Sequence, residues 1–404
     1  MQRRDPLIDA LRAFALAGIL LVNIQSFVWG AGEPLGYFSD ESTDVDLIVH
    51  WLLSTFVSSK FIALFAFLFG LGCALQIRAL RRAGATLADA RHTYRRRLVF
   101  LLAVGILHGL LLYYGDVLTI YSLCGFLLLR HVAQRPAQLA RATRRWWLAF
   151  AVVTVVGGVI VFAATPYIAA DGEPQAIAED SLRSFEVFTT AGYAEQLPWR
   201  AAEYIELQTS VLIFAVPQIM ALFTLGLLAG RLGWLSRPRR HSRIWRLARR
   251  AGAVALPVAV LGGWLSTTSL LMTPGTPSML GSTLVTLSTP LAAWYVAATI
   301  SSWRTRRGQA AIRWLAPAGR MPLTNYLLQS LVMGALLSGW GAGLGGRLNH
   351  AQLVGIAILV VAAQWLLSRW WIGRFGQGPV EALWRRATYG SARPAATNPE
   401  RGER

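Results

Sequence analysis

Long apolar runs separated by short polar segments form the dominant pattern along this chain. A helix needs about 20 mostly apolar residues to cross the hydrocarbon layer of a bilayer. Most of the runs lack an amphipathic period, which is typical of helices surrounded by lipid and protein. We count ten candidate spans, at residues 10–29, 60–77, 98–114, 117–129, 146–166, 207–230, 252–272, 281–300, 322–340 and 351–371. The pattern therefore predicts an all-α fold, a polytopic transmembrane helical bundle of about ten spans.

Two short stretches qualify this count. The apolar run at 45–57 contains only 13 residues, which is too few to span a bilayer, so we expect an outer-face or re-entrant segment there. The runs at 98–114 and 117–129 are also short, and they fit one long hairpin with Gly115 and Asp116 at its tip.

Composition narrows the class of protein. The 404 residues are 54% hydrophobic and only 15% charged, whereas soluble domains carry about 25% charged residues. The formal net charge is nevertheless +19, and Lys60 is the only lysine among the 39 basic residues. These values exclude an ordinary soluble enzyme and a disordered chain. They leave a polytopic membrane protein or a nucleic-acid binder with an apolar core.

The positions of the arginines decide between these two classes. Segments rich in arginine alternate with acidic segments: the basic ones lie at 78–97, 130–145, 231–250, 301–320 and beyond 373, and the acidic ones at 30–46 and 165–204. The alternation is in phase with the spans, so the positive-inside rule places both termini and the basic loops in the cytoplasm. Their arginines then face the anionic lipid surface. No nucleic-acid partner is expected, because no reading motif accompanies them.

We expect a single integral membrane domain over residues 1–390 and a disordered cytoplasmic tail at 391–404. The strong preference for arginine over lysine is typical of GC-rich bacterial genomes, and the expected location is the bacterial inner (plasma) membrane. Cys73 and Cys124 each lie within a span, which predicts neither a disulfide nor a metal site. The pattern carries no signal for an oligomeric state.

Ionisable groups inside spans are costly and mark candidate sites. His108 lies roughly 16 Å from the cytoplasmic end of the third candidate span, at ~1.5 Å per residue, which is near the membrane midplane. Its imidazole could act as a general base or accept an acyl group, or it could be a neutral core histidine. Asp116 follows on a similar helix face but about 12 Å away, so contact requires a bend near Gly115. His108 and Asp116 are the candidate catalytic residues.

Four polar residues at the ends of the first two spans are candidate substrate-binding residues. Asp9 and Arg12 share a face at the cytoplasmic mouth of the first span, as an interfacial ion pair or as an anchor for a polar ligand. Asn23 lies in the outer third of the same span, where an interhelical hydrogen bond is the alternative. Lys60 stands at the outer mouth of the second span, where its ammonium either snorkels to the interface or serves a site.

The start of the ninth candidate span is unusually polar for an apolar segment. Thr324, Asn325, Gln329 and Ser330 lie close together there, and Asn325 and Gln329 are i, i+4 neighbours. Helix starts of this kind can bind anions. Thr324, Asn325 and Gln329 are therefore candidate binding residues, together with Arg97 from a basic cytoplasmic segment.

Five blocks carry recognisable motifs: Leu7–Leu16 with Gly18–Ile24, Lys60–Gly72, Arg96–Gly109 with Gly115–Leu118, Gly319–Ser330, and Gly376–Arg385 with Thr388–Tyr389. These blocks resemble the YeiB-like bacterial membrane proteins (domain of unknown function 418) over nearly the whole chain. Ala13 stands where that family is expected to have glycine. The resemblance implies a distant similarity to membrane acyltransferases, some of which move acetyl groups from cytosolic acetyl-CoA to a sugar on the far side. Their catalytic histidine is not carried over, and His108 is a candidate on its own chemistry and position.

The leading hypothesis is transfer of an acyl group from cytosolic acyl-CoA to a small-molecule, sugar or lipid acceptor at the outer face. The acyl-CoA would be a co-substrate docked among the cytoplasmic candidate residues, and no bound cofactor is expected. A transporter or exporter of a small metabolite with a midplane polar site is the alternative. A lipid-organising or partner-binding scaffold is a third interpretation.

Overall fold

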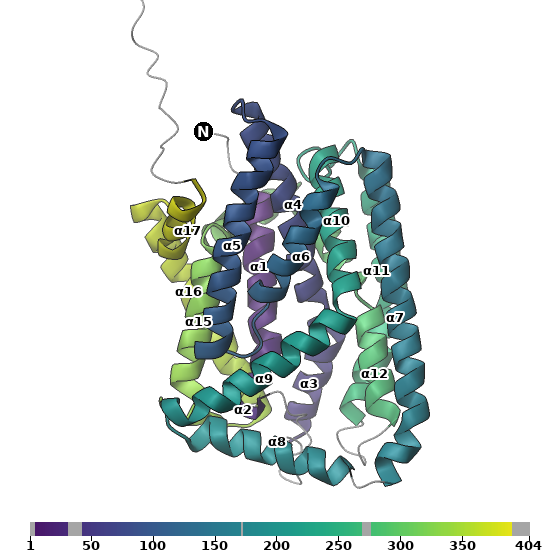
Figure 1. The fold of residues 1–404 in the computed structure, drawn as a ribbon, viewed down its shortest axis with the longest axis vertical. Coiled ribbons are helices and arrows are strands. Elements are labelled where there is room, and N and C mark those ends of the chain that lie inside the picture. The colour runs from purple at the N-terminus through teal and green to yellow at the C-terminus, as the bar shows by residue number, and fades with distance from the viewer. Residues whose placement is uncertain (1–4, 31–42, 171–172, 269–275, 390–404) are drawn as a thin grey trace, which may run out of the picture.

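The structure is a computed structural model that describes residues 5–30, 43–170, 173–268 and 276–389. Within these residues helices form nearly everything and no strand occurs, so the expected all-α fold is confirmed. The helices pack as a bundle whose long axis is vertical in Figure 1. They are α1 (Pro6–Asn23), α2 (Ser26–Trp29), α3 (Asp44–Phe56), α4 (Lys60–Arg82), α5 (Leu87–Leu111), α6 (Leu118–Leu128), α7 (Pro136–Ala170), α8 (Glu173–Thr190), α9 (Tyr193–Phe214), α10 (Val216–Leu232), α11 (Ser242–Thr268), α12 (Thr276–Leu287), α13 (Leu291–Ser302), α14 (Arg306–Gly319), α15 (Pro322–Leu337), α16 (His350–Phe375) and α17 (Pro379–Tyr389), with 3₁₀ turns η1 (Leu129–His131) and η2 (Leu344–Gly346).

Several helix starts follow directly from the local sequence. Thr43 and Asp46 form a reciprocal capping box at the start of α3, and Thr86 and Asp89 form another at the start of α5. A third box begins α16 at Asn349. In each box the two side chains accept hydrogen bonds from backbone amides that a helix start leaves without intrahelical partners.

The arginine-rich segments gather at one end of the bundle. The α4–α5, α6–α7 and α10–α11 connections and α17 all lie at the upper end in Figure 1. Helix α8, which belongs to the acidic segment 165–204, lies across the opposite end. The alternation of charge along the chain is thus a separation of charge in space.

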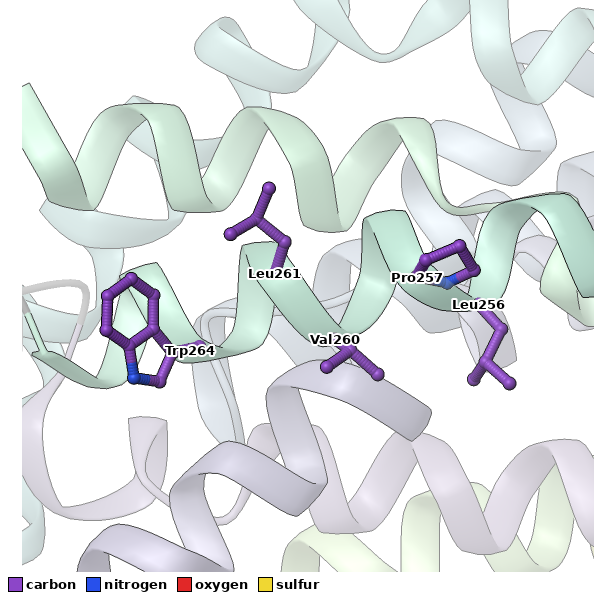
Figure 2. A pocket seen from close by; sticks show the side chains of 5 residues that line it. All are labelled: Leu256, Pro257, Val260, Leu261 and Trp264. Atoms are coloured by element: carbon purple, nitrogen blue, oxygen red, sulfur yellow. The ribbon is translucent and has the colours of Figure 1, made fainter.

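The sides of the bundle are apolar. Val156 on α7, Val254 on α11 and Leu359 on α16 are among many exposed large aliphatic side chains. An open hollow on α11 has the same character, as Figure 2 shows, and is lined by Leu256, Pro257, Val260, Leu261 and Trp264. So much apolar surface is unfavourable in water but suits a lipid environment. The helical, apolar structure is that of a membrane protein.

The expected count of ten spans is not confirmed. In the described part of the chain six helical segments are long and apolar enough to span: Pro6–Asn23, Asp44–Arg82, Pro136–Ile160, Ser242–Thr268, Leu280–Ser302 and His350–Phe375. A seventh results if α9 and α10, which meet at a 66° bend, form one broken span. Helices α6 and α15 contain only 11 and 16 residues, fewer than the ~20 that a span needs. The expected spans at 117–129 and 322–340 are therefore not confirmed.

The apolar run at 45–57 is not an isolated segment. It forms α3, which continues into α4 within one apolar stretch of 39 residues, Asp44–Arg82. The break between the two helices lies at Ser59, whose φ of 66° is left-handed and rare for a residue with a side chain. Lys60 begins α4 directly after this break.

Helices α4 and α10 approach each other closely through glycine. A Cβ atom placed on Gly70 would meet the backbone of Phe223, and one placed on Gly226 would meet the backbone of Phe67. Small residues at such a contact allow the close backbone packing that holds helices together in lipid.

We expect Gly226→Ala to destabilise the protein by about 1–3 kcal/mol, because the added methyl group forces α4 and α10 apart. Thermal unfolding of the detergent-solubilised protein measures this change. Gly373→Ala in α16 is the matched control, since a Cβ at Gly373 meets nothing within 4 Å. Equal melting temperatures for Gly226→Ala and wild type would contradict the close contact.

Candidate functional site

The hairpin of α5 and α6 carries both candidate catalytic residues. Residues 112–117 join the two helices, and Figure 1 shows the chain turning back before it reaches α8. The amides of Leu112 and Tyr113 both donate to the carbonyl of His108, which winds the end of α5 tightly. The turn brings Asp116 Oδ1 to 2.9 Å from His108 Nδ1.

The hairpin expected over 98–129 is therefore confirmed, and it contains the bend near Gly115 that a contact between His108 and Asp116 requires. The estimate of about 12 Å assumed that one straight helix carries both residues. Helix α5 instead ends at Leu111, so Asp116 lies on the returning chain and points back to His108.

Ser330 on α15 is a third member of the site. Its Oγ lies 2.8 Å from His108 Nε2. In the tautomer in which His108 carries its proton on Nδ1, His108 donates that proton to Asp116, since a carboxylate accepts hydrogen bonds. The unprotonated Nε2 then accepts a hydrogen bond from the Ser330 hydroxyl. The three side chains are joined in the order serine, histidine, carboxylate, which is the order of an activated nucleophile.

Sequence reasoning placed Ser330 in a polar helix start and gave it no role. Tyr326 precedes it by four residues, and this spacing puts both side chains on one face of α15. Tyr326 also reaches the site, since its hydroxyl lies 3.4 Å from Asp116 Oδ1 and its ring centroid 4.8 Å from that of His108. The i, i+4 spacing of Tyr326 and Ser330 was the feature of the sequence that could have identified Ser330 as a member of the site.

Asp116 is held from several directions. The amide of Thr119 donates to its Oδ2 at 2.7 Å, as in a helix cap. Gln208 on α9 donates through Nε2 to the Asp116 carbonyl at 2.8 Å. Thr119 in turn bonds the hydroxyl of Tyr204 on α9 at 2.9 Å. Both carboxylate oxygens and the backbone are thereby fixed.

The site is enclosed by packed side chains. His108, Asp116 and Ser330 are only 2%, 2% and 4% exposed. The ring of Tyr113 lies 6.3 Å from that of His108 and closes another side. The imidazole is therefore closed to bulk water in this structure, and the exclusion of water strengthens electrostatic interactions around it.

Three of the four candidates at the span ends have local partners. Arg12 Nη1 bonds Asp9 Oδ1 at 2.8 Å, which is the expected ion pair on one helix face. Lys60 is fully buried and its Nζ donates to the carbonyl of Ser54 at 3.0 Å, so it does not snorkel to the interface. Asn23 is half-buried at the last residue of α1. None of these contacts involves His108.

Asn325 and Gln329 join α15 to α16. Asn325 Nδ2 donates to Ser368 Oγ at 3.0 Å, and Gln329 Nε2 donates to Gln364 Oε1 at 2.9 Å. Gln364 completes the ladder by donating to the carbonyl of Asn325 at 3.2 Å. These bonds are interhelical, and they fix the helix that carries Ser330.

Arg97 lies in an aromatic cage at the arginine-rich end. Its guanidinium is 5.0 Å from the ring centroid of Trp384 and 5.2 Å from that of Tyr94, within cation–π range. Its Nη1 donates to Gln76 Oε1 at 2.6 Å. Trp384 belongs to α17, so Arg97 helps to seat that helix.

Comparison with known proteins covers almost the whole chain. Residues 229–391 match the family described as "Protein of unknown function (DUF418)". The chain is 28% identical to "Uncharacterized protein YxaH" of Bacillus subtilis (strain 168), over 97% of this chain and 96% of that protein. It is also 28% identical to "Uncharacterized protein YeiB" of Escherichia coli (strain K12), over 98% and 100%. The resemblance to YeiB-like proteins is confirmed. No solved structure matches the chain significantly.

The DUF418 match includes α15 and α17, which meet through a half-buried carboxyl group. Glu381 on α17 accepts hydrogen bonds from the amides of Leu323 at 2.7 Å and Thr324 at 3.2 Å, and from the Thr324 hydroxyl at 2.6 Å. The Glu381 carboxyl group thus occupies the helix start at which the sequence predicts an anion site. Burial raises the pKa of Glu381 above its ordinary value, and the bonds from Thr324 and Leu323 oppose that shift.

We expect the contact between α17 and α15 to weaken as pH rises through the raised pKa of Glu381. A carboxyl with a raised pKa in the fold stabilises it fully below about pH 4.3 and loses this contribution at higher pH. Glu381→Gln stays neutral, so its melting temperature relative to wild type should increase from acidic to neutral pH.

Thermal unfolding of both proteins across this pH range measures the difference, with the exposed Glu206→Gln as control. A difference between wild type and Glu381→Gln that stays constant with pH would show that Glu381 does not titrate in this contact.

Proposed function

We propose that this DUF418 protein is a multipass protein of the bacterial inner membrane that transfers an acyl group. The donor is cytosolic acyl-CoA, and the acceptor is a small molecule, sugar or lipid at the outer face. The observation that carries the proposal is a buried imidazole, His108, oriented by Asp116 inside an apolar bundle.

The chemistry follows from the tautomer. Because Asp116 accepts the Nδ1–H of His108, the Nε2 lone pair is available to take a proton from a hydroxyl group. Removing that proton makes the oxygen a nucleophile toward a thioester carbonyl. Acyl transfer thus needs no metal or prosthetic group at this site, only a held base and two substrates.

The position of the site suits a reaction between a donor from the cytoplasmic side and an acceptor from the outer side of the membrane. Ser330 lies about 12 Å along α15 from its first residue, at ~1.5 Å per residue, so the site is inside the bundle. The arginine-rich end offers a positive field for the phosphates of CoA. The acceptor would then approach from the opposite end, where α8 lies.

Transport of a metabolite remains the second candidate, and one feature favours it. The α9–α10 pair is bent by 66° and α9 contacts Asp116 through Gln208. Transporters of the inverted-repeat type place such broken helices in both halves of the chain. The described residues contain one such bent pair of apolar helices and no counterpart in the other half of the described chain. Acyl transfer is therefore the better-supported proposal.

We expect inside-out membrane vesicles that contain the protein to transfer radiolabel from acetyl-CoA to a product other than CoA. His108→Ala should lower the rate by about 10²–10⁴-fold, because the base is lost. His131→Ala is the control, since His131 lies at the far end of α6 and bonds Gln134.

Asp116→Asn should also lower the rate, because an amide can stabilise the wrong imidazole tautomer. Equal rates for wild type and His108→Ala would remove His108 from the reaction. No labelled product with acetyl-CoA or longer acyl-CoA donors, together with flux of an unmodified solute, would favour transport.

A further inference from the structure

Ser330 is placed differently from many of the hydroxyl groups inside helices of this protein. Thr143, Thr209, Thr224 and Ser301 each donate to the carbonyl four residues earlier in their own helix. This is the usual way for a hydroxyl to be satisfied in an apolar segment. The Ser330 hydroxyl is instead aligned with His108 Nε2 at 2.8 Å.

We propose that Ser330 is the catalytic nucleophile and carries the acyl group as an ester during the reaction. The proposal rests on the acyl transfer proposed above and adds a covalent intermediate to it. Three observations support it: the Ser330–His108–Asp116 order, the fixed carboxylate, and the exclusion of water from all three side chains.

The first half-reaction loads the serine. As Oγ of Ser330 attacks the thioester carbonyl, His108 Nε2 takes the hydroxyl proton and Asp116 stabilises the imidazolium. The C–S bond then breaks, and the CoA thiolate leaves with the proton from His108. The products are acyl-Ser330 and CoA-SH, and His108 is neutral again.

The second half-reaction transfers the acyl group from Ser330 to the acceptor. A hydroxyl or amine of the acceptor attacks the ester carbonyl, and His108 takes its proton. The bond between the carbonyl carbon and Ser330 Oγ breaks, and His108 returns the proton to Oγ. The two half-reactions balance in atoms and electrons without an oxidant, a reductant or a metal.

A covalent intermediate also suits the closed site. Both substrates need the same imidazole, which is 2% exposed. If the acyl group stays on Ser330, CoA can leave before the acceptor enters, and the two substrates use the site in turn. The expected kinetics are ping-pong.

A fluorophosphonate probe, which reacts with activated serines, tests the proposal on the full-length protein in nanodiscs. Peptide mass spectrometry should find the probe on Ser330 of the wild type. His108→Ala and Ser330→Ala should lose the label. Ser122→Ala should keep it, because Ser122 is equally buried and its Oγ has no hydrogen-bond partner among the described residues.

Incubation with acetyl-CoA alone should add one acetyl group to the wild type and to Ser330→Cys, whose thiol can also be acylated. Ser330→Ala should not gain the group and should lose acyl transfer by at least about 10³-fold. Equal melting temperatures of wild type and Ser330→Ala show that the variant folds.

The outcomes separate the two proposals. Acyl transfer at a near wild-type rate in Ser330→Ala would overturn the serine role and leave the function standing. If the probe labels Ser330 in a way that depends on His108 but no acyl-CoA donates an acyl group, Ser330 remains the nucleophile and acyl-CoA is overturned as the donor. Loss of transfer in Ser330→Ala without label or acetyl-enzyme in the wild type would reduce Ser330 to a positioning residue.

Discussion

The need to satisfy a buried turn controls the centre of this structure. Residues 112–117 leave the helical conformation inside an apolar bundle, where an unpaired backbone group costs several kcal/mol, of order 2–7. Side chains from other helices supply the missing partners. Tyr193 and Arg200 donate to the carbonyl of Leu111, Gln208 donates to that of Asp116, and Tyr326 accepts from the amide of Val117. Irregular backbone at such depth is found where protein surrounds it.

This constraint explains why α9 and α15 lie against the α5–α6 hairpin. Gln208 on α9 and Tyr326 on α15 bond the backbone of the turn, and Tyr326 also bonds the Asp116 carboxylate. Ser330 lies one helical turn beyond Tyr326 on α15. The long helices α7, α11 and α16 present apolar faces outward and are not needed at the turn. The apolar faces of α7, α11 and α16 thus lie on the outside, whereas α5, α6, α9 and α15 together build the polar site.

The sequence predicted the fold class better than the count of spans. Hydropathy identifies apolar helices, but it does not distinguish a span from a short packed helix such as α6 or α15, because both have a high content of apolar residues. The i to i+8 spacing placed His108 and Asp116 on one face, yet their contact depends on the end of α5, which has no proline and is fixed by tertiary bonds. Ser330 was missed because a serine in an apolar helix usually bonds its own backbone. The polar face of Asn325 and Gln329 was visible in the sequence, but only the packing of α16 shows that these amides serve helix contact.

A base inside an apolar bundle works only if the charge it acquires is compensated. Protonation of an isolated imidazole there would create an unpaired buried cation, which is strongly unfavourable. Asp116 lies 2.9 Å away, and its negative charge makes the protonated pair neutral. The Thr119 amide and the Tyr326 hydroxyl stabilise the carboxylate in the resting state, when no cation is present. In the proposed reaction, a carboxylate at this position would cancel the charge that His108 acquires. This argument requires Asp116 to stay on the returning chain beside His108, which depends on the bonds that hold residues 112–117 in place.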